Sequence, residues 1–289
     1  MRDPIATVVS IIVAIFFATL VGSIYFKLGH GQAGITDRLG VLFFLTMNTA
    51  FSNLGSLAIF LFERSIYVRE HRNGMYSPMA YYMGKIIQDV PLACAVNCLF
   101  DVIAYYMVGL QPAAIKFAWF FFISTLIMLN SYTLCMFLSN LSPNYQVANV
   151  VAPLVFVLYL LPSGFLINLN SIPLVWRWIK YISFVRYGFE ALVINEFEGQ
   201  MFSCDYPYSL VLEKITEEAY DHAHNITQPP VSNSTLAPCR IDGLSYVEQQ
   251  FGFARDDFNM DIYVCGGSVI VYLLLGYCSL RFLRSNEGK

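Results

Sequence analysis

Charged side chains are scarce in this sequence. Asp, Glu, Lys and Arg make up 13% of its 289 residues, whereas about 25% is usual in soluble domains, and none of the four occurs between residues 117 and 176. Hydrophobic residues make up 57%, above the roughly 45–50% of soluble proteins. The net charge is -3, and the basic residues are scattered, which excludes the clustered basic surface of nucleic-acid-binding proteins. We therefore expect lipid as the solvent and no nucleic-acid partner.

Residues for ATP hydrolysis or metal chemistry are also missing from the sequence. It contains no glycine-rich loop of the form G-x-x-x-x-G-K-[ST], whose backbone would hold the phosphates of ATP. All four histidines fall in segments that we expect to be loops. His222 and His224 would supply two metal ligands, and a zinc site takes at least three from the protein. We therefore expect no catalytic residue, no metal site, no cofactor bound by this chain itself and no ATP hydrolysis by the chain alone.

Long apolar runs are abundant instead. A helix needs about 20 mostly apolar residues to cross a bilayer, and the first such run is too long for the apolar region of a signal peptide. The longest uncharged stretch is interrupted at residues 140–144 by Asn-Leu-Ser-Pro-Asn, which favours a turn. We predict an all-α membrane protein, a single transmembrane domain over residues 1–289. Its six helices are expected at about residues 5–27, 39–62, 83–109, 116–139, 146–167 and 262–283.

Basic residues indicate the orientation of these helices, because Lys and Arg in short loops favour the cytoplasmic side. If both termini are cytoplasmic, the basic residues on the cytoplasmic side are Arg2, Arg64, Arg69, Arg72, Lys85, Arg281, Arg284 and Lys289. Those on the outside are then only Lys27, Arg38 and Lys116 among the short segments. We therefore predict two cytoplasmic termini and a large external region at residues 168–261. Two Asn-x-Ser/Thr sequons in this region predict glycosylation of Asn225 and Asn233.

The seven cysteines divide by position. Five of them lie in apolar spans, where a cysteine is usually a small buried hydrophobic residue. Cys204 and Cys239 lie in the external region, and an oxidising compartment favours a disulfide bond between them. The alternative is that both thiols are free or paired separately.

Two acidic residues fall within the third predicted span. Asp101 is a functional candidate, because a carboxyl group is costly to bury in a membrane. The alternative is a structural role near the outer interface, where it pairs with a neighbouring helix. Asp89 follows Lys85 by four residues, so the two side chains share a helix face and partly neutralise one another.

The segment between the second and third spans, residues 63–82, mixes both signs of charge with apolar residues. This pattern predicts a short amphipathic helix that lies against a partner, with Gly74 and Pro78 ending it. A plain solvated loop is the alternative.

Several segments together resemble the G subfamily of ABC transporters, including the White and breast-cancer-resistance-protein half-transporters. Besides the linker just described, these are residues 40–46 (GVLFFLT), 163–168 (SGFLIN), 181–192 (YISFVRYGFEAL) and 195–200 (NEFEGQ). The resemblance extends over nearly the whole chain, and its motifs occur in the order that the family has.

The resemblance implies the membrane half of an ATP-driven exporter of lipophilic compounds, lipids or sterols, in the plasma membrane. Its partners would be a nucleotide-binding domain, encoded by the same or a separate gene, and a second half-transporter in a homodimer or heterodimer. The complete protein would be an ATP-hydrolysing translocase that uses ATP and Mg²⁺ through that domain. Because the sequence begins at the first helix, we expect either a fragment or a separately encoded ATPase. The alternative is a truncated accessory subunit that pairs with full half-transporters and lowers their activity.

The resemblance also implies roles for particular residues. The linker would form the coupling helix, with Glu63, Arg69, Glu70 and Lys85 transmitting the stroke of the ATPase. The substrate cavity would be lined by Phe44, Asn48, Phe51, Val157 and Leu160, and the gate above it formed by Phe165 and Leu166. Spacings of four and three residues place the three cavity residues of the second helix on one face, although ordinary helix packing gives the same pattern. Residues 172–197 would form re-entrant helices, and Cys204 and Cys239 match the intrachain disulfide of the family.

Overall fold

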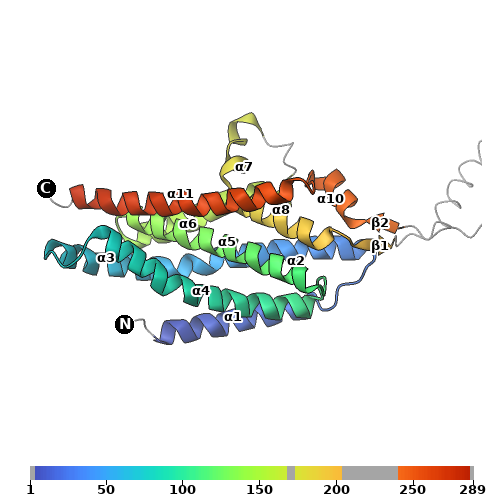
Figure 1. Cartoon of the computed structure of the whole chain (residues 1–289), viewed down its shortest axis with the longest axis horizontal. Helices are drawn as coiled ribbons and strands as arrows, with labels where there is room; N and C mark the ends of the chain where they lie inside the picture. Colours follow the sequence, from blue (N-terminus) through green and yellow to red (C-terminus); the bar gives the residue numbers. More distant parts are fainter. Residues whose placement is uncertain (1–3, 168–172, 204–239, 287–289) are drawn as a thin grey trace, which may run out of the picture.

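The computed structural model describes residues 4–167, 173–203 and 240–286, with side chains from residue 7 to residue 281. Long helices run side by side along one axis, and both termini lie at the same end of the bundle (Figure 1). Among the described residues six helical segments are long and apolar enough to cross a membrane: Thr7–Ile24, Gln32–Arg72, Pro78–Val108, Ala114–Leu141, Tyr145–Ser163 and Asp257–Arg281. The prediction of an all-α membrane protein with six spans is therefore confirmed.

The second span is a helix interrupted by a short 3-10 turn, and it is much longer than a bilayer requires. It consists of α2 (Gln32–Phe51), the 3-10 turn η1 (Ser52–Gly55) and α3 (Ser56–Arg72). The helix therefore begins before residue 39 and continues past residue 62, so that most of the expected coupling loop is helical. Only residues 73–77 separate α3 from α4. Gly74 has a φ of +76°, a conformation that glycine adopts without strain at the end of a helix.

The next helix, α4 (Pro78–Val108), begins with Ser77 as its N-cap and Pro78 in its first turn. The Ser77 hydroxyl accepts a hydrogen bond from the backbone N–H of Ala80, which satisfies one donor of the helix start. The helix ends at Gly109 in the left-handed conformation, and α1 (Pro4–Ile24) packs along it.

Helix α5 (Ala114–Leu141) is the centre of the bundle. It contacts α2, α3, α4, α6 (Tyr145–Leu160), α8 (Phe184–Phe197) and α11 (Asp257–Asn286). Two of its amide side chains bond across to the backbone of α11, Asn130 to the carbonyl of Cys265 at 2.9 Å and Asn140 to that of Gly276 at 3.2 Å. Such interhelical hydrogen bonds hold helices together where lipid removes the hydrophobic driving force.

The segment between α6 and α11 turns back into the bundle. After η2 (Leu161–Ser163), the short η4 (Leu174–Trp176) and α7 (Ile179–Ile182) project sideways, and α8 returns beside α5 (Figure 1). All residues of α8 except Arg186 are buried. The end of the bundle opposite the termini carries the antiparallel pair β1 (Met201–Ser203) and β2 (Arg240–Asp242), followed by α10 (Gly243–Phe251).

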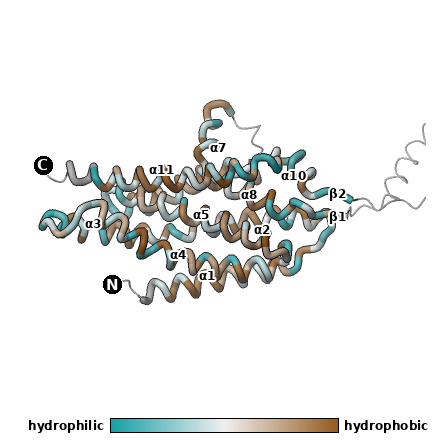
Figure 2. The backbone as a smooth tube through the Cα atoms, in the orientation of Figure 1, coloured by the Kyte–Doolittle hydropathy of each residue, from teal (hydrophilic) through white to brown (hydrophobic). Residues whose placement is uncertain are grey.

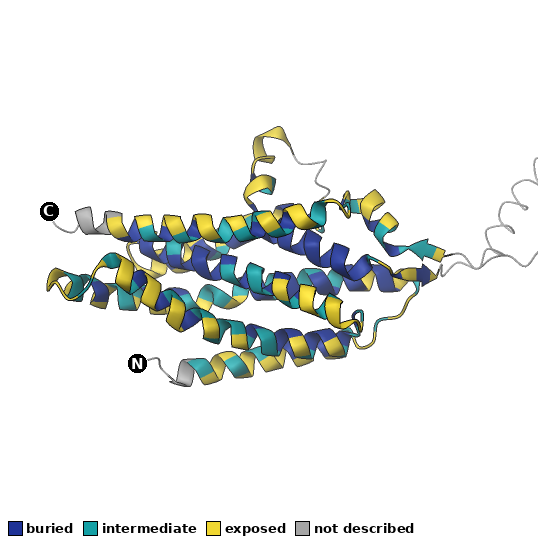
Figure 3. Cartoon of the chain, viewed as in Figure 1, coloured by how far each residue is buried: buried dark blue, intermediate teal, exposed yellow. Residues whose placement is uncertain are grey.

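The surface of the bundle is apolar along its length. Brown, hydrophobic segments dominate the helices in Figure 2, and teal, hydrophilic segments gather near the α3 turn and near β1, β2 and α10. Figure 3 shows α8 in the dark blue of buried residues, while α1 carries many exposed ones. Exposed Ile12 and Phe16 of α1 illustrate this pattern, which suits a lipid surrounding.

Candidate functional site

The end of α3 and the start of α4 form a hairpin over residues 63–89, called here the α3–α4 hairpin. Buried Lys85 of α4 forms ion pairs with Glu63 of α3 and, at 2.9 Å, with Asp89 one turn further along α4. The pair of Lys85 and Asp89 that the sequence spacing predicted is therefore present. Tyr132 of α5 donates a hydrogen bond of 3.2 Å to Asp89. One buried charge cluster thus connects three helices, and breaking such a cluster is costly.

Aromatic rings fix the tip of the same hairpin. Tyr67 of α3 stacks on Tyr81 of α4 with ring centroids 4.4 Å apart, and its ring also stacks on His71 at 5.6 Å. Tyr76 donates a hydrogen bond of 2.5 Å to Glu70. Burial of Tyr76, together with this hydrogen bond and the charge of Glu70, raises the tyrosine pKa to about 12. Of the predicted coupling residues, Glu63, Glu70 and Lys85 therefore make contacts within the hairpin, while Arg69 is exposed.

The predicted cavity residues lie on two neighbouring helices. Phe44, Asn48 and Phe51 of α2 are half-buried, Val157 of α6 is exposed and Leu160 is buried, and α2 contacts α6. Phe51 packs against Phe156 of α6 with centroids 5.5 Å apart, so part of this face is ordinary helix packing. Within the described residues the Asn48 side chain has no hydrogen-bond partner, which leaves its amide available to a ligand.

The predicted gate residue Phe165 is held by two aromatic residues that sequence reasoning missed. Its ring stacks on Phe43 of α2 at 4.7 Å and lies edge-on to Phe189 of α8 at 6.1 Å. The neighbouring Leu166 is exposed. Phe43 directly precedes the predicted cavity residue Phe44, but nothing in the helical spacing marks it as the contact of a residue 122 positions later in the chain.

Asp101 is buried and hydrogen-bonded. Its two carboxylate oxygens accept bonds from Asn97 at 2.8 Å, one turn earlier on α4, and from Ser124 of α5 at 3.1 Å. The side chain therefore has partners on its own helix and on a neighbouring one. This arrangement favours the structural alternative over a functional one, because buried polar groups that are satisfied add to helix packing.

A second buried ion pair lies at the opposite end of the bundle, between Arg38 of α2 and Glu196 of α8 at 2.5 Å. Sequence reasoning placed Arg38 in an external loop, which is wrong, because α2 begins six residues earlier and buries it. Glu196 also accepts a hydrogen bond of 3.2 Å from the backbone of Gln111. Burial raises the pKa of Glu196 to about 7, and the charge of Arg38 opposes that rise. The pair connects the start of α2 to the end of α8.

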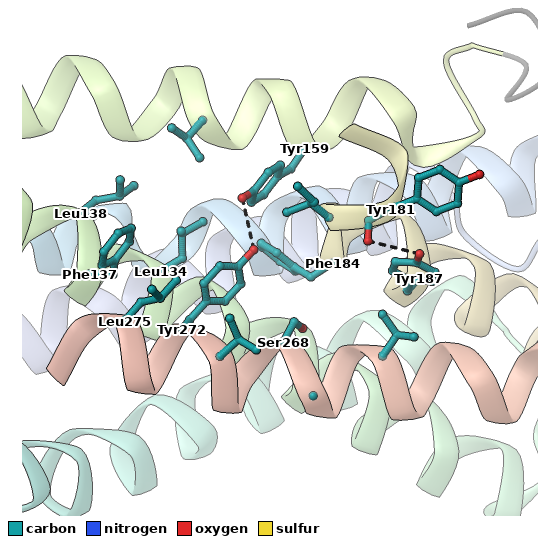
Figure 4. A pocket seen from close by; sticks show the side chains of 15 residues that line it. Leu134, Phe137, Leu138, Tyr159, Tyr181, Phe184, Tyr187, Ser268, Tyr272 and Leu275 are labelled. Carbon is teal, nitrogen blue, oxygen red and sulfur yellow. Dashed lines mark hydrogen bonds between the residues drawn. The ribbon is translucent and has the colours of Figure 1, made fainter. Parts of the chain in front are cut away.

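A pocket of about 780 Å³ lies away from the predicted cavity (Figure 4). Helices α5, α6, α7, α8 and α11 supply its walls, and its lining is almost entirely apolar and aromatic. The hydroxyl groups of Tyr159 on α6 and Tyr272 on α11 meet inside it at 3.2 Å. The sequence contained no signal for this pocket, because its residues come from segments up to about 140 positions apart.

The four residues predicted to carry the disulfide and the glycans, Cys204, Cys239, Asn225 and Asn233, lie outside the described residues. Their pairing and modification stay predictions.

Comparison with known proteins gives the family of the chain. Residues 1–197 match the ABC-2 type transporter family. The chain is 32% identical over 285 residues to ABC transporter G family member 24 of Dictyostelium discoideum, an alignment that covers 98% of this chain and 22% of the relative. It is 33% identical over 201 residues to the Broad substrate specificity ATP-binding cassette transporter ABCG2 of Mus musculus, covering 69% of this chain and 31% of the relative.

A further Dictyostelium discoideum protein, ABC transporter G family member 1, is 34% identical over 208 residues, which are 70% of this chain and 26% of the relative. The chain thus spans between about a fifth and a third of the length of these relatives. The family match, the relatives and the six helical spans agree with the resemblance inferred from the motifs. The chain belongs to the ABC-2 type transporter family and has a transmembrane domain of the G subfamily.

Proposed function

We propose that the chain is the membrane-spanning part of an ATP-driven exporter of lipophilic compounds, lipids or sterols. It would act as a dimer, with nucleotide-binding domains supplying the ATP and Mg²⁺ chemistry. Membership of the ABC-2 type transporter family supports a transport role. The name of the mouse relative, a broad substrate specificity ATP-binding cassette transporter, supports an ATP-driven mechanism with substrates of several kinds.

The observation that carries this proposal is the α3–α4 hairpin. Its short turn, residues 73–77, stands between two helices that are joined by the ion pair of Lys85 with Glu63 and by the stack of Tyr67 on Tyr81. A hairpin locked in this way moves as a unit, so force applied at its tip reaches α2 through α3 and η1. The exposed side chain of Arg69 is a contact for a nucleotide-binding domain on this face.

The substrate would lie against α2 and α6 of two copies of the chain. Exposed apolar residues line one side of α6, among them Val150, Leu154 and Val157, and an apolar surface of this kind suits a second copy or an apolar substrate. The unpartnered amide of Asn48 beside Phe51 supplies the polar group that ligand sites use for orientation. This arrangement fits a flat apolar ligand between two copies.

The proposal is tested by joining the chain to the nucleotide-binding domain of a G-family relative and reconstituting it in liposomes. We expect vanadate-sensitive ATPase activity that a lipophilic dye stimulates, together with ATP-dependent export of the dye. Lys85→Met should remove the stimulation, because Glu63 and Asp89 lose their shared partner. Lys116→Met is the matched control, since it breaks the 2.7 Å pair with Glu198 at the opposite end of the bundle and should leave stimulation largely intact.

Two outcomes would contradict the proposal. The first is a complex that binds the nucleotide-binding domain but neither hydrolyses ATP nor exports the dye. The second is a chain that lowers the ATPase activity of a complete half-transporter when the two are produced together, which would favour the accessory-subunit alternative.

A further inference from the structure

Three acidic side chains and one basic side chain come together where α8 packs against α11. Arg186 and Glu190 lie one turn apart on α8, and Asp257 and Asp261 lie one turn apart on α11. Glu190 and Asp261 are buried, with 2% and 1% of their surface exposed, while Arg186 and Asp257 are half-buried. The four groups are near enough for their charges to act on one another. They are called here the α8–α11 charge cluster.

Two contacts fix how α8 and α11 are aligned. The ring of Phe189 lies edge-on to Phe253, just before α11, at 6.0 Å, and the thiol of Cys265 donates to the backbone carbonyl of Phe184 at 3.6 Å. The two helices therefore run antiparallel. Asp261 lies four residues before Cys265, a rise of about 6 Å along α11, which brings its carboxyl group level with the middle of α8.

The carboxylate of Asp261 has no donor to stabilise a negative charge. Among the described residues neither of its oxygens accepts a hydrogen bond. Asp101, which is equally buried, differs in this respect, because it accepts hydrogen bonds from Asn97 and Ser124. An ionised carboxylate that is buried without such partners is strongly unfavourable. Asp261 is therefore the group of the cluster whose charge most needs compensation.

One positive charge faces the two buried carboxyl groups. The Arg186 guanidinium lies 3.5 Å from a carboxylate oxygen of Glu190, farther than in an ordinary hydrogen bond, and that oxygen has no hydrogen-bond partner among the described residues. Two buried carboxylates against one guanidinium leave an excess of one negative charge. Asp257 adds a further negative charge, which water screens because its side chain is only half-buried.

The neighbouring helices do not supply the missing positive charge. Besides the four cluster residues, the titratable groups that face Asp261 are Tyr187 of α8 and Cys265 of α11, and both types of side chain are uncharged at neutral pH. The nearby cations of α2, α4, α5 and the segment before α11 have acidic partners of their own: Arg38 with Glu196, Lys85 with Glu63 and Asp89, and Lys116 and Arg255 with Glu198.

We propose that Glu190 and Asp261 form a proton-binding site, in which the two carboxyl groups share one proton at neutral pH. With this proton the side chains of Arg186, Glu190 and Asp261 are neutral together, and α8 packs on α11 without an uncompensated charge. A proton is favoured over a metal ion because, among the residues that the structure describes, no group of three or more His, Cys, Asp or Glu side chains could hold one.

The site lies beside the support of the predicted gate. Phe189, the residue before Glu190, lies edge-on to Phe165 at 6.1 Å and to Phe43 at 5.8 Å. Loss of the proton would place two like charges between α8 and α11, next to this support. The bearing on the gate rests on the proposed function. Proton binding itself requires neither ATP nor transport, so it is tested separately.

The test is infrared spectroscopy of the whole chain at pH 7.5 in dodecyl maltoside, a detergent without carbonyl groups. A protonated carboxyl group has a carbonyl stretch that an ionised one lacks. Asp261→Asn should lower this band by the amount of one carboxyl group. Glu190→Gln should lower it equally, because Asp261 and Arg186 then form a balanced ion pair that needs no proton. Asp257→Asn, the same change one turn earlier on α11, is the control and should leave the band unchanged.

Thermal unfolding gives a second measurement. An unfolded aspartate ionises near pH 4, so wild-type protein at pH 7.5 must take up a proton at this site when it folds. The amide in Asp261→Asn can donate to Glu190 without that uptake. This variant should therefore unfold roughly 2–4 °C above wild type at pH 7.5, and the difference should shrink as the pH falls toward 4.

Four results would overturn the proposal. An unchanged band in Asp261→Asn would show that no proton is held there. A band that Asp261→Asn lowers and Glu190→Gln leaves intact would show a single buried acid rather than a shared site. An unfolding temperature that rises with sodium concentration, in wild-type protein without the band, would assign the site to a metal ion. Should the variants fail to fold, wild-type protein labelled with carbon-13 at the aspartate carboxyl groups decides, because a band that does not shift with the label contains no aspartic acid.

Discussion

Tyr76 and Glu70 join across the turn between α3 and α4, where the tyrosine hydroxyl donates a hydrogen bond of 2.5 Å to the glutamate carboxylate. The two residues lie at the tip of the α3–α4 hairpin, at the end of the bundle where both termini lie (Figure 1). Glu70 was expected to face a partner protein. Its role toward a partner stays a prediction, and its carboxylate also stabilises the shape of the surface that the partner would meet.

The first prediction tests whether Arg69 and Glu70 contact the nucleotide-binding domain or only maintain the shape of the α3–α4 hairpin. Exchanging the charges of Arg69 and Glu70 (Arg69→Glu with Glu70→Arg) should leave folding and surface delivery intact while uncoupling ATP hydrolysis from export. Tyr76→Phe removes only the hydrogen bond, which contributes about 0.5–1.5 kcal/mol, and should reduce coupling less. Export and substrate-stimulated ATPase are measured in the chain joined to a nucleotide-binding domain. Normal export by the charge-exchanged protein would rule out docking through these residues.

The second prediction concerns the α2–α6 face. Phe51→Ala should weaken the substrate stimulation of ATPase and the rate of export by roughly two- to tenfold, because an aromatic contact adds about 0.5–1.5 kcal/mol beyond its buried area. Phe156→Ala is the control: this neighbouring ring is fully buried, so its truncation should cost about 3–5 kcal/mol of folding free energy. Surface expression and transport are measured for both variants. If Phe51→Ala lowers expression as Phe156→Ala does, while export per molecule is normal, Phe51 is a packing residue.

The third prediction distinguishes the two interpretations of Asp101. Asp101→Asn keeps an oxygen acceptor for Ser124 or Asn97 and should be tolerated in both folding and export. Asp101→Leu leaves the Ser124 hydroxyl without an acceptor, while Asn97 keeps its 3.0 Å hydrogen bond to Ser124, and should lower the free energy of unfolding by about 1–3 kcal/mol. Thermal unfolding in detergent and export in liposomes are compared. Loss of export by Asp101→Asn with unchanged unfolding would show a functional carboxylate and contradict the structural interpretation.

The fourth prediction concerns the pH dependence of stability at the Arg38–Glu196 pair. Burial raises the pKa of Glu196 from 4.5 to about 7, so the folded state binds the proton more tightly than the unfolded state does. This contribution is present in full below pH 4.5 and is lost as the pH rises through 7, which amounts to at most about 3 kcal/mol. Wild-type protein should therefore unfold at a higher temperature at pH 5.5 than at pH 8.

Two variants check this assignment. Glu196→Gln cannot titrate and should reduce the difference between the two pH values. Glu198→Gln is the matched control, because hydrogen bonding to Lys116 lowers the pKa of Glu198, so that its contribution is lost at low pH instead. A pH difference that Glu196→Gln leaves unchanged would assign the effect to another group.

Part of this protein could be predicted from its sequence because the cause is local. A run of about 20 apolar residues crosses a bilayer whatever its neighbours are, and the six spans followed from such runs. The contact between Lys85 and Asp89 follows from helix geometry alone. The turn at residues 73–77 was predicted from Gly74 and Pro78, and α3 ends at Arg72, just before it.

Other features were decided only when the helices packed. Arg38 and Glu196 are 158 residues apart, and Glu63 meets Lys85 across two helices. Phe165 stacks on Phe43 rather than on the neighbouring predicted cavity residue, Phe44. The pocket that contains Tyr159 and Tyr272 is lined by residues of five helices. Lipid is as apolar as the side chains that it surrounds, so the hydropathy of a span does not say which of its faces meets another helix. That choice depends on shape and on interhelical hydrogen bonds, which exist only in the assembled bundle.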